Sequence, residues 1–171
     1  MTPTWQRSER SGGGGDGARR ALPGPGERAP SWPASLAPLP SSGRRAKAEA
    51  PRGVNVLLVE DDDGLREAVV HGLGKAGFSV SGAATGREAL DLARERTPDA
   101  VVIDVLLPDS GGLGLATEMR QRPGLNAVPI LFITALAPAV VRDTLYPAPV
   151  LYKPFTYRQL VASVRYLVQG R

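Results

Sequence analysis

The chain has 171 residues, no cysteine and a formal net charge of +4. The lack of cysteine excludes disulfides and thiolate metal sites, and it suits a protein of the reducing cytoplasm, where we expect this one to be. No apolar stretch approaches the roughly 20 residues that span a bilayer, so we expect no membrane interaction.

Residues 1–52 are predicted to be a disordered tail. They are rich in glycine and proline, and their few apolar residues follow neither a helical nor a strand period. They carry nine Lys and Arg against four Asp and Glu, whereas residues 53–171 carry twelve against thirteen. The basic charge therefore belongs to the tail, and we expect no direct DNA binding by the remainder. A basic arm that touches nucleic acid or a partner is the alternative interpretation of the tail.

From residue 53 onward, short apolar runs alternate with amphipathic stretches of helical length, which is typical of buried parallel strands joined by helices. The predicted strands are 54–60, 78–83, 100–104, 128–134 and 150–152, and the predicted helices are 63–76, 85–96, 112–122 and 156–168. A fourth helix between the prolines of residues 137–149 should be short. The pattern predicts an α/β fold, a flavodoxin-like doubly wound sheet of five parallel strands in the order 2-1-3-4-5.

Polar side chains stand where these strands end. Glu60 and Asp61 follow the first strand, Asp104 and Thr134 end the third and fourth, and Lys153 follows the fifth. In an open parallel sheet, ligands bind at the carboxyl ends of the strands, so these five side chains should converge. Three carboxylates, a hydroxyl and an ammonium indicate a site for a divalent cation and a phosphoryl group.

Four motifs carry a resemblance to a known family. They are LVEDD at residues 58–62, DVLLP at 104–108, Thr-Ala at 134–135 and Lys-Pro-Phe at 153–155. In this order, with 43 residues from the second acid of the first motif to the aspartate of the second, they resemble the receiver domain of two-component response regulators. The resemblance covers residues 53–171.

The resemblance implies a function. A sensor histidine kinase or a histidine phosphotransfer protein would donate a phosphoryl group to Asp104 in a Mg²⁺-dependent reaction, with Thr134 and Lys153 contacting that group. The implied metal ligands are Glu60, Asp61, Asp104 and the backbone carbonyl of Leu106. The phosphorylated chain would signal to an unidentified downstream protein through a changed surface, without turning over a separate substrate. Because the chain ends soon after the last predicted helix, we expect a single-domain regulator.

Two other functions fit part of the pattern. A phosphohydrolase of the haloacid dehalogenase class also places Asp, Thr or Ser, and Lys around Mg²⁺, but its acid/base aspartate would stand at Leu106, which cannot transfer a proton. A pseudo-receiver that acts without phosphorylation would be expected to have lost some of its acids, and here the acids are complete. His71, the only histidine, is predicted to lie on the surface of the first helix.

Several positions depart from the usual family pattern. The side chains that flank the path of an attacking water are Leu106 and Leu136, which implies slow loss of the phosphoryl group. Val150 stands where an aromatic switch residue is common, and Tyr152 should face away from Lys153 on its strand. The resemblance also implies a cis peptide bond before Pro154. The glycine-rich residues 111–114 are predicted to be a flexible loop that enters the third helix.

Overall fold

The computed structural model describes residues 53–109, 111–145 and 148–169. The prediction of a disordered tail therefore concerns a segment, residues 1–52, that lies outside the described residues. Within the described part of the chain, no helix combines the length and the apolar character needed to cross a membrane.

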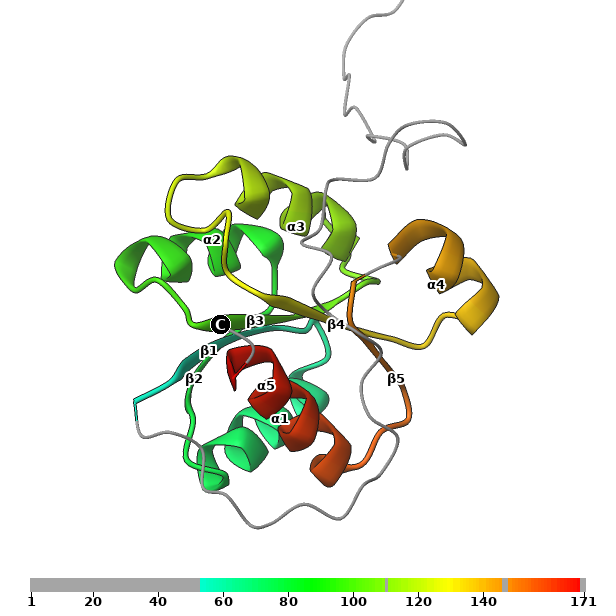
Figure 1. Ribbon diagram of the computed structural model, residues 1–171, viewed down its shortest axis with the longest axis horizontal. Coiled ribbons are helices and arrows are strands. Elements are labelled where there is room, and N and C mark those ends of the chain that lie inside the picture. The colour runs from blue at the N-terminus through cyan, green and yellow to red at the C-terminus, as the bar shows by residue number, and fades with distance from the viewer. Residues whose placement is uncertain (1–52, 110, 146–147, 170–171) are drawn as a thin grey trace, which may run out of the picture.

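Five parallel strands form one sheet in the order β2-β1-β3-β4-β5, which confirms the predicted fold (Figure 1). The strands are β1 Asn55–Val59, β2 Ser79–Ala83, β3 Ala100–Asp104, β4 Ile130–Thr134 and β5 Val150–Tyr152. The helices are α1 Asp63–Lys75, α2 Gly86–Glu95, α3 Gly111–Gln121, α4 Pro138–Leu145 and α5 Tyr157–Gln169. Helix α4 has eight residues, so the short fourth helix was predicted correctly.

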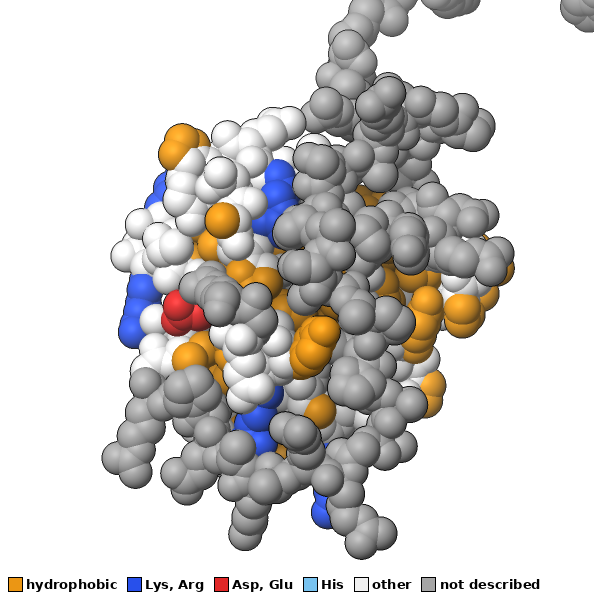
Figure 2. Space-filling view, viewed as in Figure 1, with side chains coloured by type: hydrophobic (Ala, Val, Ile, Leu, Met, Phe, Trp, Pro, Cys, Tyr) orange, Lys and Arg blue, Asp and Glu red, His pale blue; other side chains and the backbone are white. Residues whose placement is uncertain are grey.

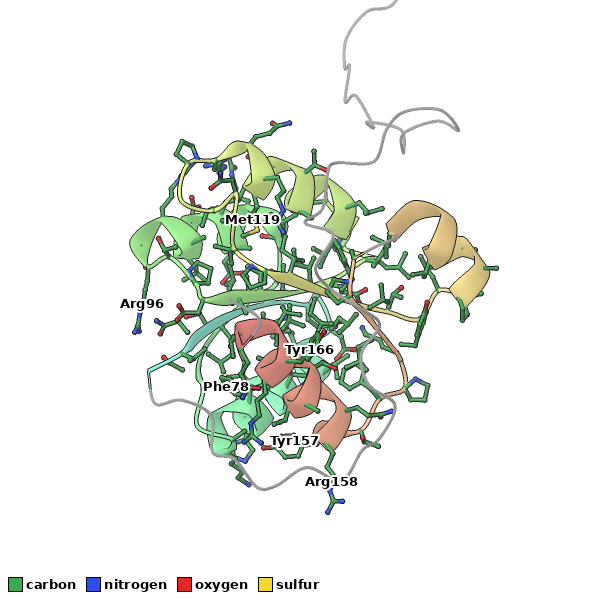
Figure 3. All side chains as sticks on the ribbon, in the orientation of Figure 1. Phe78, Arg96, Met119, Tyr157, Arg158 and Tyr166 are labelled. Carbon is green, nitrogen blue, oxygen red and sulfur yellow. The ribbon has the colours of Figure 1, made fainter. Side chains whose placement is uncertain are left out.

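The helices cover both faces of the sheet. Helices α2, α3 and α4 lie on one face, and α1 and α5 lie on the other (Figure 1). Each face of the sheet has its own hydrophobic core, and successive side chains of a strand point to opposite faces. Leu57 and Val59 of β1 therefore lie in the core beneath α2, α3 and α4, and Val56 and Leu58 lie in the core beneath α1 and α5. Figure 3 shows the two layers through Met119 on the α3 side and Phe78 with Tyr166 on the α1 and α5 side. The central strands β3 and β4 are fully buried, which explains their continuous apolar sequences.

Local capping sets the helix starts. The side chain of Asp62 accepts a hydrogen bond from the Leu65 amide at 2.7 Å and begins α1. Thr85 caps α2 through the Glu88 amide, and Glu88 in turn accepts from the Ala84 amide at 2.8 Å. These two bonds form a capping box whose return bond is displaced by one residue.

The predicted flexible loop at residues 111–114 is wrong, because all three of its glycines lie in the first turn of α3, which begins at Gly111. Gly111 has a positive φ of 69°, a conformation that glycine adopts without steric cost. The remaining boundaries differ from the predictions by one or two residues. Strand β4 begins at Ile130 because Pro129 before it has no amide to donate to the ladder.

Candidate functional site

The three acids meet at the carboxyl edge of the sheet. Glu60 and Asp61 come directly after β1, and Asp104 is the last residue of the adjacent strand β3. Carboxylate oxygens of all three lie within 4.8 Å of one another. Glu60 and Asp104 are 1% and 5% exposed, whereas Asp61 lies at the surface. The cluster therefore opens to solvent on the Asp61 side and is closed by the protein on the other.

Lys153 brings a positive charge to this cluster. Its Nζ donates to Glu60 Oε2 at 2.8 Å and to Asp104 Oδ2 at 2.6 Å, so one ammonium joins the ends of β1, β3 and β5. Burial by itself lowers the pKa of Lys153, but the hydrogen bonds to the two carboxylates outweigh burial and raise that pKa. The lysine is thus held in its charged form.

Glu60 responds differently to the same surroundings. Burial raises the pKa of Glu60, and the nearby Asp104 charge adds to this effect, although the Lys153 hydrogen bond lowers it. The pKa of Glu60 therefore lies above its ordinary value, chiefly because the carboxyl group is buried. A cation bound at the cluster would favour the charged form of Glu60.

Thr134 and the segment after Asp104 complete the edge. Thr134 is fully buried, and its Oγ1 accepts a hydrogen bond from the Leu136 amide at 3.0 Å. Its carbonyl accepts from the Lys153 amide at 2.8 Å, which places the hydroxyl and the ammonium on neighbouring strands. The peptide bond between Lys153 and Pro154 is cis, as the resemblance implies. Tyr152 is exposed and Lys153 is turned into the site, as predicted.

The backbone of Asp104 is pressed against α3. A Cβ atom placed on Gly112 would lie 2.0 Å from the carbonyl oxygen of Asp104, far inside van der Waals contact. The Gly112 amide donates to the Val105 carbonyl at 3.0 Å. The start of α3 can therefore approach the end of β3 only because residue 112 has no side chain.

The sequence analysis missed two residues of this region. Arg66 on α1 donates to the backbone carbonyl oxygens of Glu60 and Asp61. Asp109 accepts a hydrogen bond from the Gly86 amide at 2.8 Å and so ties the segment after Asp104 to the start of α2. The arginine stands three residues after Asp63, a helical spacing that the sequence does display. The hydrogen bond between Asp109 and Gly86 joins residues 23 positions apart, so no local sequence pattern predicts it.

The donor set fits a hard divalent cation. Magnesium prefers oxygen ligands and is usually held by one or two carboxylates together with water and phosphate oxygens. Glu60, Asp61 and Asp104 supply such oxygens at one edge of the sheet. Because Asp61 is exposed, a cation bound there could also be reached by water and by a phosphate group. The Leu106 amide donates to Asp104 Oδ1 at 2.9 Å, which holds that carboxylate beside the residue predicted to offer a carbonyl ligand.

Comparison with known proteins identifies the family. The family model of the response regulator receiver domain matches residues 56–165, well over half of the chain. This chain belongs to the response regulator receiver family. Receiver domains are signalling modules of two-component systems rather than enzymes with a substrate to turn over.

Curated relatives of this receiver are response regulators. Response regulator MprA of Mycolicibacterium vanbaalenii is 38% identical over 119 residues, which are 68% of this chain and 51% of that protein. Transcriptional regulatory protein CreB of Escherichia coli is 38% identical over 120 residues, covering 67% of this chain and 50% of CreB. The receiver chain thus spans about half the length of the curated relatives that it matches.

Solved structures show the same fold. The chemotaxis response regulator CheY4 of Vibrio cholerae has a TM-score of 0.62 and 31% identity, covering 67% of this chain and 98% of that one. The receiver domain of a signal transduction histidine kinase from Syntrophus aciditrophicus has a TM-score of 0.63 and 29% identity, covering 69% of this chain and 92% of that one. Both solved structures therefore share the fold of the described region of this chain.

Proposed function

We propose that residues 53–171 accept a phosphoryl group on Asp104 in a Mg²⁺-dependent reaction, with a sensor histidine kinase or a histidine phosphotransfer protein as the donor. The observation that carries this proposal is the meeting of Glu60, Asp61 and Asp104 with Lys153 at the carboxyl edge of the sheet. Mg²⁺ bound by the three acids and the Leu106 carbonyl would neutralise charge between the donor and the attacking carboxylate.

The protein's own groups would perform the remaining steps. An oxygen of Asp104 forms a bond to phosphorus while the bond from phosphorus to the donor nitrogen breaks, and the nitrogen keeps its electron pair. Lys153 is held charged beside Asp104 and would pair with a phosphoryl oxygen once the acid carries the group. The buried Thr134 hydroxyl would donate to another phosphoryl oxygen.

The test is phosphorylation by a small donor. Full-length protein incubated with acetyl phosphate and Mg²⁺ should gain the mass of one phosphoryl group, measured on the intact protein. The same mixture with excess EDTA should show no gain, because the acids then repel the donor. Labelling that is equally fast with EDTA would contradict the metal-dependent reaction.

Two leucines should make the phosphorylated form long-lived. Leu106 is 53% exposed beside the acceptor, and Leu136 follows Thr134 with its side chain half-buried. Neither side chain can orient an attacking water by a hydrogen bond. We expect Leu106→Asn and Leu136→Glu each to accelerate loss of the group by on the order of tenfold, the effect of roughly 1.4 kcal/mol in a barrier.

The measurement for the leucines is decay of the phosphorylated protein in Mg²⁺ after the donor is removed. An exposed hydrophobic residue of α4 offers the control, since Val140→Asn should decay like the parent. Parent decay within seconds, or no acceleration by either substitution, would show that the leucines do not limit access of water.

We expect the surface that changes on phosphorylation, and that a downstream protein would bind, to lie on the α4 and β5 side of the domain. Phosphoryl contacts with Thr134 and Lys153 would bias the packing of the segment between them. Val140 and Tyr152 are 53% and 37% exposed, and hydrophobic side chains gather on the α4 side in Figure 2. Val150 packs half-buried against the core in place of an aromatic switch, so loop repacking would carry the change.

Amide chemical shifts offer the check on this output. Adding beryllofluoride, a phosphoryl mimic, to the Mg²⁺ form should shift backbone amides chiefly within residues 134–158. We expect the same addition to an Asp104→Asn variant to leave these amides in place. Shifts confined to α1 and α2 would place the responding surface elsewhere.

A further inference from the structure

Arg66 connects α1 to the segment that carries two of the three acids. Its Nη1 donates to the carbonyl oxygen of Glu60 at 2.8 Å and to that of Asp61 at 3.3 Å. Its Nη2 forms an ion pair with Asp63 on the same helix. The side chain is only 19% exposed although its ion-pair partner is 83% exposed. This arginine is therefore packed into the domain rather than extended into solvent.

The stem of Arg66 is held where β2 has a glycine. A Cβ atom on Gly82 would lie 3.3 Å from Cγ and 3.4 Å from Cδ of Arg66, so those methylenes occupy the space that a side chain would need. The Glu60 amide also donates to the Ala83 carbonyl at 3.0 Å. Strand β2 thus supports both the arginine and the start of the acidic segment.

Two adjacent carbonyls bonded to one guanidinium restrict the peptide planes on both sides of Asp61. The direction of a side chain follows from its backbone, so restricting these planes also restricts where the Glu60 and Asp61 carboxylates point. The guanidinium is planar and permanently charged, which lets it serve several oxygen acceptors at fixed angles. Groups that orient metal ligands from behind in this way commonly change metal affinity by about 10-fold to 100-fold when they are removed.

We propose that Arg66 is a positioning residue of the divalent-cation site, which orients Glu60 and Asp61 through their backbone carbonyls without touching the ion. The proposal rests on the metal site of the proposed function. It assigns the residue no part in the chemistry of phosphoryl transfer.

The test compares Mn²⁺ affinity of full-length Arg66→Met with that of the parent by calorimetric titration without any phosphodonor. Methionine keeps an apolar stem beside Gly82 and removes the donors. We expect the dissociation constant to rise by about tenfold. In the labelling reaction the Mg²⁺ concentration for half-maximal rate should rise in parallel, while the rate at saturating Mg²⁺ should recover.

The chain offers a matched control. Arg94 pairs with Asp91 on α2 with the same spacing of three residues, and both side chains are exposed at the surface. Arg94→Met should bind Mn²⁺ like the parent. If Arg66→Met does not fold, as judged by circular dichroism, Arg66→Lys replaces it, since lysine keeps the charge but cannot span both carbonyls and Asp63. A weakening of Mn²⁺ binding by several-fold is then expected.

Unchanged Mn²⁺ affinity in a folded Arg66 variant would overturn the proposal, even if the variant melts at a lower temperature, because a purely structural arginine predicts that result. Equal weakening in Arg94→Met would overturn it as well, since charge alone would then explain the effect. A parent protein that does not bind Mn²⁺ at all would contradict the metal site itself, and with it the proposed function.

Discussion

Asp104→Asn should abolish phosphorylation. The asparagine amide is a poor nucleophile and carries no negative charge, so neither attack on phosphorus nor cation binding would survive at the centre of the site. The carboxylate now pairs with Lys153 and accepts from the Leu106 amide, and asparagine can still accept one such bond. The variant should therefore fold while gaining no phosphoryl mass from acetyl phosphate in Mg²⁺.

An aspartate outside the site provides the control for that experiment. Asp91 lies on α2, is exposed, and pairs with Arg94 on the same helix. Asp91→Asn removes one surface charge and should label at close to the parent rate. Peptide mapping of the labelled parent should place the group on Asp104. Label that persists in the Asp104 variant would mean that another residue is the acceptor.

Gly112→Ala is expected to disrupt the site by displacing the backbone of Asp104. The added methyl would lie 2.0 Å from the Asp104 carbonyl oxygen and 2.9 Å from the Val105 Cα, and both of these atoms are backbone. Backbone at the end of a fully buried central strand cannot move aside cheaply, so α3 or the strand end must shift. We expect a loss of about 3 kcal/mol or more in the free energy of unfolding, at the upper end of overpacking effects.

The same substitution should reduce phosphorylation beyond its effect on stability. Displacing the Asp104 backbone would move the carboxylate away from its partners, and small displacements of reacting groups are costly. Urea unfolding and labelling rate at low temperature measure the two effects separately. Gly74→Ala on α1 is the matched control: a Cβ there meets nothing within 4 Å, so it should stabilise the protein by about 0.5–1 kcal/mol. Parent-like stability of Gly112→Ala would show that the helix start is free to move.

Local patterns in the sequence were sufficient for the architecture. Apolar runs of strand length, joined by stretches with helical period, specify buried parallel strands, since a strand covered on both faces needs apolar side chains throughout. The helix caps at Asp62 and Thr85 follow from contacts over three residues, and such contacts are visible in the sequence itself. Polar residues at strand ends located the site, because the carboxyl ends of parallel strands share one edge.

Tertiary structure alone decided how the site is held. The glycine run after Asp104 is a poor helix former, which favours a loop, yet packing of α3 against β3 makes it helical and requires Gly112 to lack a side chain. Arg66 has the sequence appearance of a surface residue on α1, and only the approach of the segment after β1 supplies the carbonyls it binds. Lys153 meets Glu60 across 93 residues. Contacts of this kind depend on how separate elements pack, and no periodicity within a single element encodes them.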